Sequence, residues 1–142
     1  MAQANVKFKI RATGPDLFFS AKINDRPFVV QRATNDWIEF YHEFDDGPGH
    51  YLLEFEMAGK LPQHTQLDTE GNIVKDQWIE IRDFELSGHA CQSALVEHSH
   101  YLHDFNGTGH TVRQGFYGDM GCNGVVRFEF QGPVPLWLLE NT

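Results

Sequence analysis

Basic residues are scarce in this chain of 142 residues. Lysine and arginine number 11 against 20 aspartate and glutamate residues, which gives a formal net charge of −9 at pH 7. The few basic residues are scattered and form no run, whereas phosphate-binding surfaces need clustered lysine and arginine. The charge pattern therefore argues against a broad nucleic-acid surface and predicts no nucleic acid among the partners.

Long apolar segments are lacking too. No stretch approaches the roughly 18–20 apolar residues of a membrane-spanning helix, and residues 1–7 hold no hydrophobic region of a signal peptide. We therefore expect no membrane partner and a chain that is made in the cytoplasm and not secreted. In that reducing compartment the two cysteines, Cys91 and Cys122, are expected to be free thiols. They are too few for a cysteine-based zinc motif.

Helical periodicity is nearly absent, and alternation of apolar and polar residues takes its place. The alternation runs over residues 6–11, 37–44, 50–57 and 125–130. A period of two predicts strands with one buried face and one wetter face, and clusters of glycine, proline, asparagine and aspartate separate them. The pattern predicts an all-β fold, an antiparallel β-sandwich of jelly-roll type. It leaves room for at most one short helix, over residues 92–97.

Two local features refine this domain. Between residues 77 and 86 the apolar phase changes after Ile81, which predicts a β-bulge near Arg82 and Asp83, or burial on both faces. Residues 1–132 are expected to form the β-sandwich, and residues 133–142 a C-terminal strand or docking arm of the same domain. The prolines at the start of that last segment would keep it out of a central sheet position.

Catalytic signatures are missing as well. The sequence has no Gly-x-Ser-x-Gly motif and no phosphate-binding glycine loop. Its many carboxylates alternate along strands, as on a solvated face, and Cys91 with His89 lacks a third catalytic member. The sequence therefore predicts no catalytic residues and a protein that is not an enzyme.

Histidines gather in residues 97–110, where His98, His100 and His103 precede Asp104. Histidines two residues apart on a strand point the same way, and with a carboxylate they could bind zinc or iron. A metal-dependent enzyme using these residues is a third function to consider. The alternative is a long polar loop that contacts a neighbouring subunit, since the stretch lacks the fixed spacing of a zinc signature.

An acidic stretch offers oxygen ligands around a glycine. Asp68, Glu70, Asn72 and Asp76 are the candidate calcium ligands. Their spacing does not match the EF-hand loop. The alternative is a solvated hairpin loop in which aspartate and asparagine make turn hydrogen bonds.

Aromatic residues supply the candidate contact surface. Trp37 and Tyr41 lie on the otherwise charged face of their predicted strand, and Tyr101 and Phe105 flank glycine-rich turns. With Trp137 they could form a stacking platform for sugar rings or the centre of a protein interface. The alternative is that both faces of those strands are covered.

Three segments carry a resemblance to known proteins. Residues 52–57, 67–88 and 133–142 resemble small virion-associated proteins of tailed bacteriophages, especially phages of aquatic bacteria. This resemblance implies a non-enzymatic structural protein of the virion, such as a capsid decoration, neck or tail component. It would be located in the virion and would work by assembly with other virion proteins and with further copies of itself.

The same arrangement of loop and strand is similar in architecture to xylan-binding-type carbohydrate modules, whose β-sandwiches bind sugars through a loop calcium. That resemblance implies the alternative function, a calcium-assisted module that recognises a host-surface glycan. No cofactor other than this calcium is expected.

Overall fold

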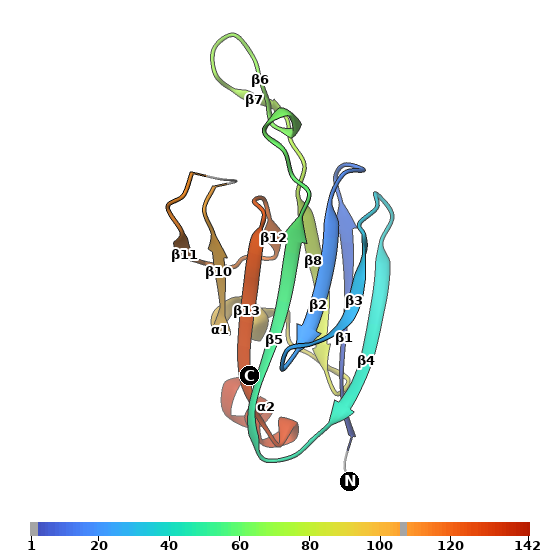
Figure 1. The fold of residues 1–142 in the computed structure, drawn as a ribbon. Coiled ribbons are helices and arrows are strands. Elements are labelled where there is room, and N and C mark those ends of the chain that lie inside the picture. The colour runs from blue at the N-terminus through green and yellow to red at the C-terminus, as the bar shows by residue number, and fades with distance from the viewer. Residues whose placement is uncertain (1–2, 106–107) are drawn as a thin grey trace.

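The computed structural model describes residues 3–105 and 108–142, which form two antiparallel β-sheets packed face to face (Figure 1). The first sheet has the strand order β12-β8-β1-β4, with β9 paired to β8. Its strands are β1 (Gln3–Ala12), β4 (Ile38–Asp45), β8 (Ile79–Leu86), β9 (His89–Ala90) and β12 (Asp119–Met120). The predicted antiparallel β-sandwich is confirmed.

The second sheet has the strand order β11-β10-β13-β5-β2-β3. Its strands are β2 (Phe18–Ile23), β3 (Arg26–Arg32), β5 (Gly49–Ala58), β10 (Ser99–His103), β11 (Val112–Gly115) and β13 (Gly124–Gly132). One edge strand of the first sheet is β4, and one edge strand of the second sheet is β3. These two edge strands lie on the same side of the sandwich. Phe28 of β3 stacks on His42 of β4, with ring centroids 4.4 Å apart, so the two edges meet there.

The inward-facing side chains of both sheets form one core rich in phenylalanine. Alternate residues of β1 are buried, as the period of two requires. Phe8 meets Phe55 of the opposite sheet edge to face, with ring centroids 4.9 Å apart. Burial of each such side chain stabilises the fold by roughly 1.5–3 kcal/mol. The fully buried phenylalanines are Phe8, Phe19, Phe55, Phe84, Phe116, Phe128 and Phe130.

The predicted β-bulge is present in β8. Lys7 pairs with Glu85 whereas Lys9 pairs with Arg82, so the intervening residue of β1 faces two residues of β8. Asp83 has a φ of 55°, the left-handed conformation that such an extra residue often adopts. The bulge lets Ile81 and Phe84 both face the core, which explains the change of phase in the sequence.

Two short helices complete the fold where one was expected. The predicted helix is α1 (Gln92–His98), but the C-terminal segment, expected as a strand or docking arm, forms a second helix, α2 (Val134–Asn141). Proline is tolerated in a first helical turn because the N–H groups there have no partner within the helix. Val134, Trp137 and Leu138, at helical spacing, are buried against the sandwich. Neither helix is long and apolar enough to cross a membrane within residues 3–105 and 108–142.

A third, two-stranded sheet stands apart from the sandwich. It consists of β6 (Gln66–Leu67) and β7 (Ile73–Lys75), preceded by the 3₁₀ helix η1 (Pro62–His64). Figure 1 shows this hairpin projecting beyond one end of both sheets. We call residues 60–76 the arm.

Candidate functional site

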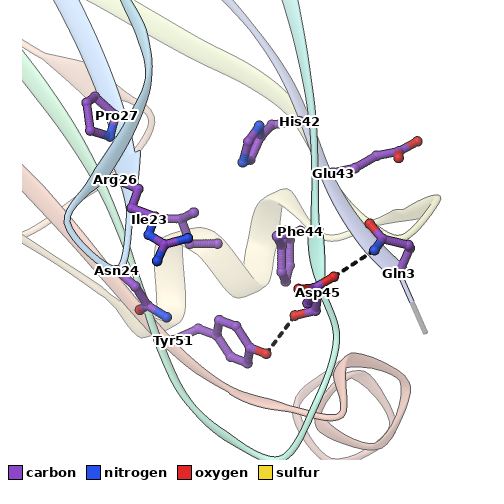
Figure 2. A pocket seen from close by; sticks show the side chains of 10 residues that line it. All are labelled: Gln3, Ile23, Asn24, Arg26, Pro27, His42, Glu43, Phe44, Asp45 and Tyr51. Atoms are coloured by element: carbon purple, nitrogen blue, oxygen red, sulfur yellow. Dashed lines mark hydrogen bonds between the residues drawn. The ribbon is translucent and has the colours of Figure 1, made fainter. Parts of the chain in front are cut away.

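A cleft of about 710 Å³ lies where the free edges of the two sheets face each other. One wall is the turn between β2 and β3, and the other is the second half of β4 (Figure 2). The starts of β1 and β5 close its end. The lining residues are Gln3, Ile23, Asn24, Arg26, Pro27, His42, Glu43, Phe44, Asp45 and Tyr51.

The turn that forms the first wall is held in a fixed conformation. Asn24 and Asp25 have φ angles of 47° and 66°, which are the values of a type I′ hairpin turn. The backbone N–H of Asn24 donates to the carbonyl of Leu52 over 2.9 Å, and the N–H of Leu52 donates to Oδ1 of Asn24 over 2.9 Å. The turn is thereby fastened to β5. Because its Oδ1 is used in this way, Asn24 keeps its amide NH₂ as a donor.

Aromatic rings line the opposite wall and the floor. His42 and Phe44 point from β4 toward the turn, whereas Glu43 between them points away (Figure 2). The ring of Tyr51 lies parallel to that of Phe130, with centroids 5.2 Å apart, and 5.4 Å from Phe44. The Tyr51 hydroxyl donates to the carbonyl of Asp45 over 2.8 Å, so the ring is fixed in place.

Polar groups stand around these rings. Nε2 of Gln3 donates to Oδ1 of Asp45 over 2.7 Å, which occupies that carboxylate at the rim of the cleft. Arg26 projects from the turn, and its guanidinium makes no hydrogen bond or ion pair with the rest of the chain that the structure describes. The cleft thus joins apolar ring faces to donors that have spare capacity.

Trp37 and Tyr41 lie outside this cleft, on the outer face of the first sheet. Trp37 is 39% exposed, and the cations of Lys9 and Arg11 sit 4.7 and 4.5 Å from its ring centroid. Tyr41 is 57% exposed and donates its hydroxyl hydrogen to Glu43 over 2.9 Å. That hydrogen bond raises the pKa of Tyr41 above its ordinary value. Both residues are accessible, but basic side chains partly cover Trp37.

Two other predicted contact residues belong to the core. Tyr101 is 6% exposed, its hydroxyl donates to the carbonyl of Cys122, and burial raises its pKa. Trp137 is 9% exposed and packs on Phe128 of β13. Neither can serve as a surface platform, because β10 and α2 turn them inward. Phe105 is half exposed and lies edge-on against His103.

The four expected calcium ligands do not come together. Asp68 at the arm tip accepts the backbone N–H groups of Glu70 and Asn72 over 2.9 Å each, and the hydrogen bond from the Asn72 backbone lowers the pKa of Asp68. Asp76 lies at the arm base, where Lys60 contacts it at 2.7 Å. The hairpin loop with turn hydrogen bonds, weighed as the alternative, is what forms here, and these four side chains do not make one ligand shell.

The three histidines also diverge. His98 ends α1 and contacts Trp137, while His100 and His103 lie on β10, the first exposed and the second buried. Nδ1 of His103 accepts the N–H of Phe105 over 3.1 Å, and its Nε2 lies 2.9 Å from Oε1 of Gln114. Both ring nitrogens are therefore occupied. Within residues 3–105 and 108–142 no three histidine, cysteine or acidic side chains form a metal-binding group.

The cleft residues Arg26, His42 and Tyr51 were not among the candidates from the sequence. One signal was available: His42 falls in the apolar phase of its strand, between Phe40 and Phe44. A polar ring in an apolar stripe marks a place where the buried face reaches solvent. The sequence did not reveal the strand order, in which β3 and β4 are the edge strands that flank the cleft.

Comparisons with known proteins show likeness of fold. No protein-family model matches the chain, and no curated protein matches it. A solved structure of vCBM60 in complex with galactobiose is similar over 87% of this chain and 96% of its own, with 13% identity and a TM-score of 0.51. The selenomethionine form of vCBM60, described as linking two families of calcium-dependent carbohydrate binding modules by circular permutation, covers 88% of this chain and 89% of its own, with 12% identity and a TM-score of 0.49. At such low identity the first likeness shows a shared β-sandwich fold alone.

Proposed function

We propose that this chain is a non-catalytic carbohydrate-binding module and that the cleft between β3 and β4 is its sugar site. The observation that carries the proposal is the cleft itself, in which fixed ring faces stand beside amide and guanidinium donors. The fold likeness to a structure that holds galactobiose supports it. No comparison supports the resemblance to virion proteins.

A sugar ring has an apolar face and a rim of hydroxyl groups, and the cleft matches both. The rings of His42, Phe44 and Tyr51 supply apolar area that orders few rotatable bonds on binding. Arg26 and the NH₂ group of Asn24 would donate to hydroxyl oxygens, and Oδ2 of Asp45, the oxygen that Gln3 does not contact, would accept from hydroxyl groups. Because the turn and Tyr51 are held by hydrogen bonds before any ligand arrives, little ordering is needed on binding.

Arg26 gives the sharpest test because it lies on the surface and its removal leaves the core intact. Binding of galactobiose and of a panel of oligosaccharides is measured by calorimetry for the native chain and for Arg26→Ala. We expect the variant to lose roughly tenfold in affinity, the effect of about 1.4 kcal/mol. Arg32→Ala, at the other end of the same strand, is the matched control and should bind as the native chain does. The proposal would be refuted if the native chain bound no oligosaccharide of the panel, or if both variants lost the same amount of affinity.

A separate experiment tests whether calcium assists sugar binding. Asp68 at the arm tip and Asp76 at the arm base do not share one ligand shell, so we propose that the cleft residues bind the sugar without calcium from the arm. We therefore expect the same affinity with and without EDTA. A loss of binding with EDTA would instead assign a calcium ion to another part of the chain.

A second candidate function is a structural role in a bacteriophage particle, located in the virion. One observation favours it, namely the apolar surface of the projecting arm, since assembly proteins bury such surfaces between chains. Imaging of purified particles with a tagged chain tests this role, and absence of the chain from all particles would reject it.

A further inference from the structure

The arm carries apolar side chains that its own chain leaves in water. Leu67 is 58% exposed, and Ile73 and Val74 are each 63% exposed. Ile73 pairs with Leu67, while the adjacent Val74 points to the opposite face of the hairpin. A two-stranded hairpin is marginally stable alone in water, and clustered exposed aliphatic groups mark a contact surface.

The base of the arm is fixed, so these groups are held out at a defined position. The Lys60 side chain is 3% exposed and contacts Oδ1 of Asp76 at 2.7 Å, while its Nζ donates to the carbonyl of Gly121 over 2.6 Å. Thr65 donates to the same carboxylate over 2.7 Å. The backbone of Lys60 exchanges two hydrogen bonds with the Asn123 side chain, of 2.9 and 2.8 Å. The arm is therefore preorganised for a partner.

A groove of complementary character lies on the outer face of the second sheet. It measures about 310 Å³, and its apolar floor includes Phe18, Val30 and Ala58. Val30 is 77% exposed and Phe18 is 45% exposed. The guanidinium of Arg32 lies 4.9 Å from the centroid of the Phe18 ring, and Glu56 also lines the groove. Ala58 is the last residue of β5, so the groove borders the point where the chain leaves for the arm.

We propose that two copies of this chain form a symmetric dimer in which the arm of each copy lies in the groove of the other. Charge complementarity selects this occupant. Asp68 and Glu70 at the arm tip match Arg32 at the groove, and Lys75 of the arm matches Glu56. Because groove and arm base are neighbours, one two-fold axis satisfies both contacts at once and closes the assembly. The dimer uses the face away from the β3–β4 cleft and stands whether or not the cleft binds a sugar.

Sedimentation equilibrium of the full chain measures the dimer directly. Ile73→Ser on the arm and Val30→Glu in the groove should each raise the dissociation constant by about tenfold or more, as truncation of a central contact does. Leu139→Ser is the matched control, because Leu139 is 82% exposed on α2 and away from both surfaces. A native chain that stays monomeric at millimolar concentration, or a control that weakens the dimer equally, overturns the proposal.

Charge reversal separates a specific contact from a damaged fold. Arg32→Glu places like charges together in its own homodimer, and so does Glu70→Arg. When the two variants are mixed, both contacts again join opposite charges, so the heterodimer should re-form with near-native affinity. Two variants that are merely misfolded would not rescue each other, and failure of the mixture to associate contradicts the proposal.

Discussion

At the base of the arm a half-buried aspartate pairs with a buried lysine, and at the tip another aspartate is exposed to water. Asp76 receives hydrogen bonds from Lys60, Thr65 and the backbone of Gln77. Asp68 caps its own turn, and its hydrogen bonds within the part of the chain that the structure describes all stay in that turn. Both were predicted as calcium ligands from their residue type, yet one joins distant segments and the other only shapes a loop.

This difference shows that the role of a carboxylate depends more on the group that it contacts than on the position of its residue in an acidic stretch of sequence. Lys60 lies 16 residues before Asp76 in the printed sequence and also reaches the carbonyl of Gly121. The pair therefore ties the arm to the loop before β13. A charge buried in this way cannot lose its partner without a large cost, whereas an exposed turn can exchange its hydrogen bonds for water.

Replacing Asp76 should have the largest effect. Asp76→Asn leaves the ammonium of Lys60, 3% exposed, without a counter-charge. We expect the free energy of unfolding to fall by about 3 kcal/mol, the lower end for breaking a buried pair, because the carboxylate itself is 23% exposed. Urea unfolding followed by tryptophan fluorescence measures this loss. Asp68→Asn is the control, and an equal loss in that control would erase the distinction between the two ends.

Acid should weaken the base of the arm next. Burial alone raises the pKa of Asp76, but the hydrogen bonds from Lys60, Thr65 and the Gln77 backbone together hold it below its ordinary 3.8. A carboxyl whose pKa is lowered by folding stabilises the fold above its unfolded pKa, and this stability is lost as pH falls through the folded pKa. We therefore expect the Tm of the native chain to drop below pH 4 more steeply than that of Asp76→Asn. Parallel Tm curves for the two proteins would show that the pair is not responsible.

Much of the sandwich was predictable because its signals are local. The alternation of apolar and polar residues predicted the long strands, and the change of apolar phase after Ile81 predicted the β-bulge at Asp83. The C-terminal segment was expected as a strand or a docking arm, and the strand is wrong because residues 134–141 form a helix. The spacing of Val134, Trp137 and Leu138 already indicated the buried face of a helix.

The site was less predictable because it is made by distant segments. Gln3, Asn24, His42 and Tyr51 meet only because β4 and β3 end their sheets on the same side, and no local pattern encodes that order. Tyr101 was expected at the surface because it lies close to a glycine-rich turn. Ser99, Tyr101 and His103 instead share the inward face of β10, so alternation was the better guide than turn composition.

Changes at the arm tip should have the smallest effect on the stability of the fold, and within one copy of the chain only a local one. Asp68→Ala removes the acceptor of the Glu70 and Asn72 N–H groups, which then turn to solvent. We expect hydrogen exchange of those two amides to become faster, while exchange in β5 and β13 stays as in the native chain. The Tm should change far less than in Asp76→Asn, because the lost hydrogen bonds are replaced by bonds to water. If Asp68→Ala also loosened the amides around Lys60 and Asn123, tip and base would form one cooperative unit, and the arm would owe its position to its turn as much as to its buried ion pair.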